Sequence, residues 1–278
     1  MTAPPEADVV VLALPAGEHA AAALPLVERG TSVVSTSDSV ADVEALLDLG
    51  PLAEAKGVSL VVGAAFSPGL TCLLARHAAD ALDELSVVHV ARLGTGGPAC
   101  AAQHHRALRG GAVDWRAGGW QRRNAGSGRE LLWFPDPVGA ADCYRAGLPD
   151  PLLLVNALRS ERAGADLERV TSRLAATRRD RLTSRLPMLR RPHPEGTIGA
   201  VRAEVRGRVD GRYETVVYGA FDRPGVAAGA VAAVAAVAVV RGEAGLPAGA
   251  GGLAASSRAR DLLAELAVRG VKAAAFTG

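Results

Sequence analysis

Two adjacent histidines, His104 and His105, are the side chains of this sequence best suited to proton transfer. Histidine titrates near neutral pH, so it can donate or accept the proton that accompanies a hydride transfer. In a regular helix, neighbouring side chains point roughly 100° apart, so we expect only one of the two rings to face a given ligand. Asp114 and His193 are candidates to complete such a site. Each histidine is also typical of a hydrogen-bonded structural residue, and this alternative stays open.

An arginine-rich segment, residues 176 to 197, is the second candidate for chemistry. Guanidinium groups bind carboxylates and phosphates through paired hydrogen bonds. We expect Arg178 and Arg179 to bind a substrate carboxylate, with His193 and Lys272 as further candidates. We also expect the segment to share one cleft between two domains with one of the adjacent histidines. A solvated basic helix face is the alternative. The arginines of the segment are Arg178, Arg179, Arg181, Arg185, Arg190 and Arg191.

The beginning of the chain predicts the elements that could position such a site. Residues 7 to 37, "ADVVVLALPAGEHAAAALPLVERGTSVVSTS", read as strand, helix and strand. Unbroken β-branched apolar runs are typical of strands covered on both faces, and successive strand–helix steps imply parallel strands. We predict strands at 8–14, 31–35 and 58–62, and helices at 18–29, 40–56 and 69–82.

Loops at the carboxyl ends of parallel strands line the ligand crevice of a nucleotide-binding sheet. Three such loops follow the predicted strands, and we assign cofactor binding to them. Ordinary turn formation also explains their Pro, Gly and Ser residues. The assigned residues are Leu14, Pro15, Ala16, Ser35, Thr36, Ser37, Ala64, Ala65, Phe66, Ser67, Pro68 and Gly69.

The pattern changes after residue 84. We predict an α/β fold in which a partial, N-terminally truncated Rossmann sheet (residues 1–84) is followed by an α+β domain with a mainly antiparallel sheet (residues 85–278). The expected elements are strands at 86–92 and 130–133, a hairpin of 201–208 with 213–221, a buried helix at 225–240, a surface loop at 245–252, and a helix with a short strand in 258–276.

The overall composition excludes several classes of protein. Hydrophobic residues make up 49% and charged residues 22% of the 278 residues, which excludes a disordered chain. The net charge is only +2, and the tryptophans lie outside the arginine-rich segment, so we expect no nucleic-acid partner. The longest uncharged run, residues 225 to 240, is too short and too rich in alanine to cross a membrane.

Cysteine usage and the amino terminus give the remaining expectations. Cys72, Cys100 and Cys143 show no metal-ligand spacing, and neither adjacent histidine has a second ligand one helical turn later, so we expect no metal site. The first residues do not resemble a signal peptide, which indicates a cytoplasmic protein.

Three segments resemble the saccharopine dehydrogenase-like oxidoreductases. They are "VVSTSDSVADVEALL" (33–47), "GAAFSPGLTCLLARH" (63–77) and "WFPDPVGAADCYRAGLPDPLLL" (133–154). The second resembles the family's Gly-Phe-Asp-Pro-Gly-Leu segment, and the third its Phe-Pro-x-Pro-Val-Gly segment. The resemblance implies a dinucleotide-binding domain, a substrate domain, NAD or NADP as cofactor, and oxidoreduction at a carbon bearing nitrogen. The substrate would then be an amino or imino acid.

Two departures from the family pattern affect these expectations. Ser67 stands where the family segment has Asp, and no Gly-x-Gly-x-x-Gly element precedes Asp8. Two glycine clusters do not replace that element, because "GTGGPA" (94–99) is closed by Pro98 without an obvious helix and "GAGG" (249–252) lies in an expected loop.

A missing first part of the sheet would leave the strand at 8–14 on an open edge. Another segment of the chain could cover that edge, a second copy could pair with it to form a homodimer, or the natural protein could begin further upstream. We favour the upstream start. Two alternative functions stay open. The chain could be a non-catalytic binding member of the family, or a glucose–fructose oxidoreductase-like dehydrogenase, whose "ALPAGEHA" step is similar.

We predict that the 278-residue chain binds NAD(P) weakly or not at all. The loops assigned to the nicotinamide side are present, but the backbone donors that hold the pyrophosphate in a glycine fingerprint are not recognised in the sequence. Isothermal titration calorimetry of the purified chain measures this affinity directly. A dissociation constant in the low micromolar range would show the prediction to be wrong.

Overall fold

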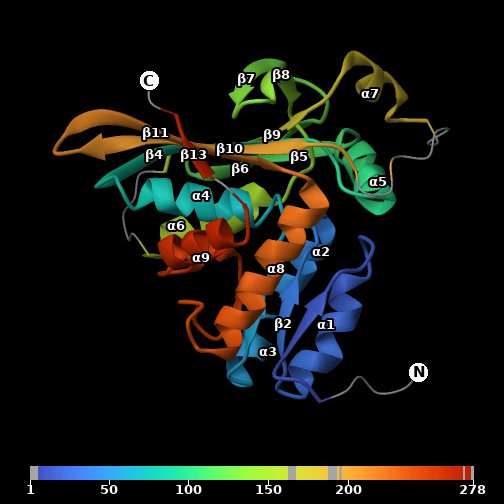
Figure 1. The fold of residues 1–278 in the computed structure, drawn as a ribbon, viewed down its shortest axis with the longest axis vertical. Helices are drawn as coiled ribbons and strands as arrows, with labels where there is room; N and C mark the ends of the chain where they lie inside the picture. Colours follow the sequence, from blue (N-terminus) through green and yellow to red (C-terminus); the bar gives the residue numbers. More distant parts are fainter. Residues whose placement is uncertain (1–5, 162–166, 187–192, 194–195, 272, 277–278) are drawn as a thin grey trace.

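Two β-sheets, with helices between and around them, form the structure (Figure 1). The computed structural model describes residues 6–161, 167–186, 193, 196–271 and 273–276. Within these residues, a four-stranded parallel sheet and a nine-stranded, mainly antiparallel sheet share one hydrophobic core. The fold class predicted from the sequence, a Rossmann-like parallel sheet followed by an α+β part, is confirmed.

The parallel sheet contains the three predicted strands and a fourth that was not predicted. Its order is β1-β2-β3-β12, so β1 (Val9–Leu12) lies at an edge of the sheet among the described strands, as expected. The predicted helix at 40–56 is two helices, because the chain restarts at Gly50 with Pro51 in the first turn. The other elements are α1 (His19–Glu28), β2 (Ser32–Ser35), α2 (Val40–Leu47), α3 (Gly50–Ala55), β3 (Ser59–Val61) and β12 (Gly249–Gly251).

The surface loop predicted at 245–252 is confirmed for residues 245–248 but wrong for 249–251, which form β12. Residues 249–251 pair in parallel with β3, with Ala250 opposite Leu60. Glycine has a low strand propensity, so composition alone favoured a loop. Directly after the strand, the chain approaches α6 closely: a Cβ on Gly252 would lie 2.9 Å from the Leu153 Cβ. The pairing with β3 has therefore overridden the low strand propensity of the two glycines.

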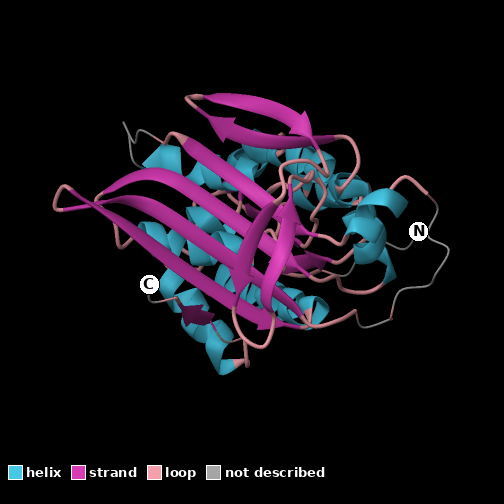
Figure 2. Ribbon diagram, turned by 90° about the horizontal axis from the view of Figure 1, so that it is seen from above, coloured by secondary structure: helices cyan, strands magenta, loops and turns pink. Residues whose placement is uncertain are grey.

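The large sheet has the order β13-β11-β10-β4-β9-β5-β6, with β7 and β8 attached through β9. The predicted hairpin is confirmed as β10 with β11, paired along its full length. Figure 2 shows these strands side by side above the helices. The bounds are β4 (Glu84–Leu93), β5 (Gly111–Arg116), β6 (Gly119–Asn124), β7 (Glu130–Phe134), β8 (Gly139–Tyr144), β9 (Arg169–Ala175), β10 (Gly199–Val209), β11 (Arg212–Asp222) and β13 (Ala273–Ala275).

The helices connect the two sheets. As Figure 1 shows, α4, α6 and α9 lie on one side of the large sheet. The predicted buried helix, α8, packs against β1, β2 and α9. The helix bounds are α4 (Leu70–Ala79), α5 (Pro98–Ala107), α6 (Asp150–Glu161), α7 (Arg178–Thr183), α8 (Pro224–Val240) and α9 (Ala259–Val268), with a 3-10 turn η1 at Leu253–Ala255.

The expectation that no helix follows "GTGGPA" is also wrong. Strand β4 ends at Leu93, the glycines form the loop, and α5 begins at Pro98. Proline is tolerated in the first turn of a helix because the N–H it lacks would have no partner there. The sequence rule that treats proline as a stop signal therefore misread a helix start.

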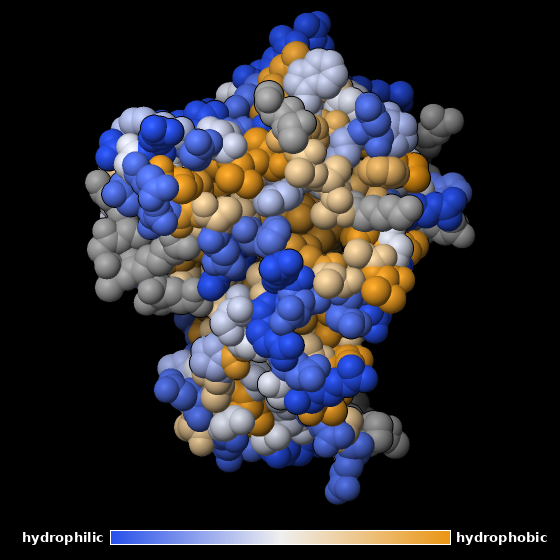
Figure 3. All heavy atoms as spheres, turned by 60° about the vertical axis from the view of Figure 1, so that its left-hand side comes forward, coloured by the Kyte–Doolittle hydropathy of each residue, from blue (hydrophilic) through white to orange (hydrophobic). Residues whose placement is uncertain are grey.

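Polar and apolar residues are both prominent on the surface. On the face shown in Figure 3, hydrophilic residues cover the top and much of the lower part, while apolar residues gather in a band between them. Beneath the surface, Val33 of the small sheet and Val88 of the large sheet belong to one buried cluster, together with Leu153 of α6. Because this core is shared, the two sheets hold each other in place.

We predict that Gly69→Ala destabilises the chain by about 2 kcal/mol more than Gly57→Ala. Both glycines have positive φ angles, +120° for Gly69 and +67° for Gly57. A Cβ at Gly69 would collide with the backbone of Ala65, whereas a Cβ at Gly57 meets nothing within 4 Å. Urea unfolding of both variants measures the difference. Equal losses would show that crowding in the loop after β3 is unimportant.

Candidate functional site

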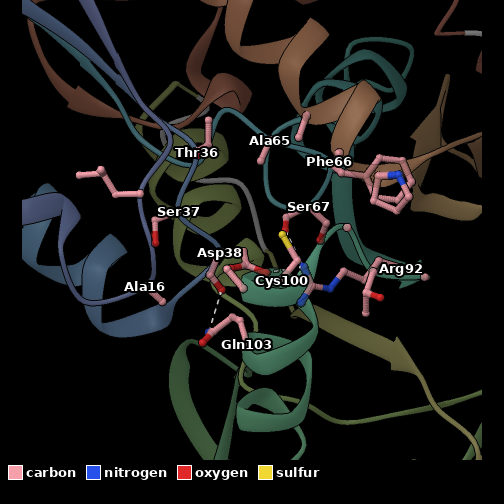
Figure 4. A pocket seen from close by; sticks show the side chains of 18 residues that line it. Ala16, Thr36, Ser37, Asp38, Ala65, Phe66, Ser67, Arg92, Cys100 and Gln103 are labelled. Atoms are coloured by element: carbon pink, nitrogen blue, oxygen red, sulfur yellow. Dashed lines mark hydrogen bonds and ion pairs between the residues drawn. The ribbon is translucent and has the colours of Figure 1, made fainter. Parts of the chain in front are cut away.

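A pocket lies where the carboxyl ends of the parallel strands face β4 and α5, and we call it the strand-end pocket (Figure 4). Its volume is about 120 Å³. Its lining residues are Leu14, Ala16, Thr36, Ser37, Asp38, Ala65, Phe66 and Ser67 from the small sheet, Arg92, Gly94, Thr95, Gly96, Ala99, Cys100 and Gln103 from β4 and α5, and Pro224, Gly225 and Ala228 from α8.

The three loops that were assigned to cofactor binding meet in this pocket, although not every residue lines it. Ser35 is buried, and its hydroxyl is hydrogen-bonded to the His19 ring at 2.9 Å. Gly69 shapes the loop behind the wall, as its φ angle shows. Pro15, Ala64 and Pro68 are likewise outside the lining. The role of the loops in cofactor binding stays a prediction.

A buried carboxylate supports the third loop. Asp150, the first residue of α6, has no exposed surface. It accepts hydrogen bonds from the hydroxyls of Ser67, at 3.1 Å, and Thr71, at 2.5 Å. Burial raises the pKa of Asp150, while the two hydroxyls and the nearby Arg92 act in the opposite direction. A buried carboxylate from a different segment of the chain therefore lies beside the Ser67 hydroxyl, outside the lining of the pocket.

Arg92 is the residue of the pocket that sequence reasoning missed. Its side chain is only 9% exposed, and its Nη1 donates to Asp38 at 2.9 Å and to the Ser67 carbonyl at 3.0 Å. Its Nε is buried without a hydrogen-bond partner among the described residues. Figure 4 shows the guanidinium reaching toward Asp38 and Ser67. A charged residue near the end of a mostly apolar strand was the available signal.

A second, wider space of about 1010 Å³ lies on the large-sheet side, and we call it the sheet-face cleft. Gly94 and Thr95 line both this cleft and the strand-end pocket, so the two spaces adjoin at that loop. The full lining is Leu93, Gly94, Thr95, Ala101, His104, His105, Arg129, Leu131, Ala140, Ala141, Asp142, Ala175, Ala176, Thr177, Arg178, Asp180 and Thr197.

Both predicted histidines line the sheet-face cleft, and so does Arg178. The two ring centroids lie 6.4 Å apart in this cleft, and the expectation that only one ring faces a given ligand stays a prediction. His104 is 8% exposed, and its Nδ1 has no partner among the described residues. Burial lowers the pKa of His104 to about 4, and the positive charge of Arg92 contributes. All lining residues of the cleft belong to the predicted second domain, residues 85–278, so the cleft does not lie between the two predicted domains as expected.

Other predicted residues are not brought to these spaces. Arg179 and His193 are exposed and line neither space, while Arg190, Arg191 and Lys272 lie outside the described residues. Asp114 is buried in β5 and lies 3.6 to 3.8 Å from three guanidinium groups instead. These belong to Arg116, Arg145 and Arg173.

Clusters of metal-ligating side chains and membrane-spanning helices are both absent from the described part of the chain. In that part, no three His, Cys, Asp or Glu side chains gather closely enough to hold a metal ion. None of the helices described there has the length and apolar character needed to cross a bilayer.

Solved structures share this fold, whereas no family model and no curated protein matches the sequence. The apo form of histidine-tagged saccharopine dehydrogenase (L-Glu forming) from Saccharomyces cerevisiae matches with a TM-score of 0.64 and 14% identity. That match covers 97% of this chain and 85% of the other. The DAP dehydrogenase of C. glutamicum in complex with DAP gives a TM-score of 0.43 at 17% identity, covering 92% and 81%. At such identities, the first match shows the fold alone.

We predict that His104→Gln reduces the acid sensitivity of the fold. Because the pKa of His104 is lowered in the folded chain from 6.5 to about 4, the neutral ring stabilises the fold above pH 6.5. That stabilisation is lost as the pH falls toward 4, by about 3 kcal/mol. Urea unfolding at a series of pH values should therefore show a flatter profile for the variant, with the contribution of buried His89 retained. A profile parallel to that of the parent would contradict this, and His193→Gln, which removes an exposed ring, is the control.

Proposed function

We propose that this chain is an NAD(P)-dependent oxidoreductase that transfers hydride between a nicotinamide and a small amino- or imino-acid substrate. The observation that carries the proposal is the strand-end pocket, in which loops from three parallel strands converge. Crevices at the carboxyl ends of parallel strands are where sheets of this type bind their cofactors. The fold shared with a saccharopine dehydrogenase supports the same reading.

The residues of the pocket fit the ring end of NAD or NADP. Leu14, Ala65 and Phe66 offer apolar surface for a flat ring, while Thr36 and Ser37 offer hydroxyls from the neighbouring loop. On this basis we propose the assigned loop residues that line the pocket as the cofactor-binding set, and the remaining assigned residues as the backbone that shapes the loops. The cofactor supplies the hydride chemistry, and the chain supplies position and proton transfer.

The sheet-face cleft is proposed as the place of the substrate. It adjoins the strand-end pocket at Gly94 and Thr95, so a substrate lying in it can reach the ring end of the cofactor. Arg178 is proposed to bind the substrate carboxylate, and His104, whose lowered pKa keeps its ring neutral, to accept the proton. In this proposal, residues 1–84 supply the cofactor side and residues 85–278 supply the substrate side. Strand β12 and helix α8 belong to the second range but pack with the small sheet, and we assign them to the cofactor side.

The proposal is tested by closing the strand-end pocket. The chain is incubated with millimolar NAD⁺ or NADP⁺ and a panel of α-amino acids, and absorbance follows formation of the reduced nicotinamide. Ala228→Trp, on the part of α8 that lines the pocket, is expected to lower the rate roughly tenfold or more by excluding the ring. Ala233→Trp on the exposed side of the same helix is the matched control and should keep the parental rate.

Two results would overturn the proposal. One is a parental chain that reduces neither cofactor with any amino acid of the panel. The other is an Ala228→Trp variant with the rate of the Ala233→Trp control, because the reaction would then occur outside the strand-end pocket.

A further inference from the structure

Two helices begin at the same corner of the strand-end pocket. Helix α5 starts at Pro98 and α8 at Pro224, and residues from both first turns line the pocket. The two starts are close, because a Cβ placed on Gly96 would lie 3.7 Å from the Gly225 nitrogen. The positive ends of two helix dipoles therefore meet at one wall.

Backbone donors are free at this corner. Among the described residues, the N–H groups of Gly97, Ala99 and Gly225 have no hydrogen-bond partner. The first N–H groups of a helix point outward along its axis and need a partner from outside the helix. No side chain caps either helix. Both starts thus leave donors available to a ligand.

Arg92 provides an independent observation at the same place. The residue is 92% buried, since 8% of its surface is exposed, and it lines the pocket. Asp38 and the Ser67 carbonyl take only its Nη1, and Nε is left without a partner. A buried guanidinium donor without an acceptor is costly unless a ligand or water completes it.

We propose that this corner, formed by Arg92, the Gly96–Ala99 turn and Gly225, binds an oxyanion of a small molecule, either a carboxylate or a phosphate group. Both chemistries present oxygens that accept several N–H donors at once, and the start of a helix is a general site for them. The strand–glycine loop–helix order of β4, "GTGG" and α5 is the context in which a glycine motif binds anions. This inference stands independently of the proposed reaction.

Substitution of Asp38 should change the anion affinity in the direction opposite to substitution of Arg92. Its carboxylate is the resident counter-ion of Arg92, at 2.9 Å, and it borders the same pocket. Neutralising it in Asp38→Asn removes a repulsive charge and a competitor for the guanidinium. Anion affinity should therefore rise in Asp38→Asn and fall in Arg92→Gln, so the two partners of one ion pair give opposite results.

The experiment is an NMR titration of the ¹⁵N-labelled 278-residue chain, with inorganic phosphate in one series and acetate in another. Saturable shifts are expected for the amides of Gly97, Ala99 and Gly225. Arg92→Gln should weaken the binding about tenfold or more, as loss of a charge-assisted bond implies. Arg109→Gln removes an exposed arginine just beyond α5 and should leave the affinity unchanged.

A second variant keeps the test informative if Arg92→Gln does not fold. Ala99→Asp places a carboxylate in the first turn of α5, where a negative charge is compatible with the helix and would occupy the corner from within. It should abolish the saturable shifts of Gly97 and Gly225. Ala233→Asp makes the same change in net charge on the exposed side of α8 and should not.

The outcome also identifies the source of the oxyanion. If NADP⁺ displaces acetate from the corner, the anion is a cofactor phosphate, and if acetate stays bound in the presence of millimolar NADP⁺ it is a carboxylate of another ligand. Either result supports the proposal. It is overturned if neither anion produces saturable shifts at these three amides, or if Ala99→Asp binds phosphate as the parent does. These shifts require no turnover, so they can succeed where the proposed reaction fails.

Discussion

The buried carboxylate of Asp150 is the group on which the geometry of the site depends. A carboxylate without exposed surface must be hydrogen-bonded or protonated, because leaving an unpaired charge in the interior costs far more than a hydrogen bond returns. The hydroxyls of Ser67 and Thr71 meet that requirement and tie the loop after β3 to the start of α6. The Ser67 carbonyl in turn accepts from Arg92, whose second partner is Asp38. One chain of polar contacts thus runs from α6 through β4 to the loop after β2.

This chain of contacts explains why a pocket persists where two sheets meet. The shared apolar core brings the sheets together, but apolar packing is non-directional and would favour closing any gap. Polar groups at the strand ends oppose full closure, because each needs a partner at a fixed distance. Arg92 cannot withdraw to solvent without abandoning Asp38 and the Ser67 carbonyl. The loops after β2 and β3 are therefore held apart by the Arg92 guanidinium that bonds to both.

The parts of the fold that could be predicted from the sequence are those in which the local propensities of the residues match the structure that they form. Valine-rich runs predicted β1 and β2, and the turn "VDGR" predicted the hairpin of β10 and β11. Strand β12 is built from Gly-Ala-Gly and α5 opens with proline, so local composition gave the wrong answer in both. Their structures follow from tertiary packing and from the special tolerance of the first helical turn, neither of which is a local property. Among site residues, the strand-end loops followed from topology, whereas Arg92 and Asp150 are defined by contacts between distant segments.

The junction at Gly94 and Thr95 makes the two spaces of the site interdependent. Gly94 has a φ angle of +89°, and a Cβ there would lie 2.6 Å from the Gly199 Cα at the start of β10. Any other residue would have to displace that strand or abandon the left-handed turn. Gly94 thus lets the loop that borders both the pocket and the cleft pack closely against β10. Gly94 and Thr95 line both the cleft and the strand-end pocket, and the same loop leads directly into the start of α5. The positions of ligands in the pocket and in the cleft therefore both depend on one short turn. The shape of this turn is fixed by its packing against β10.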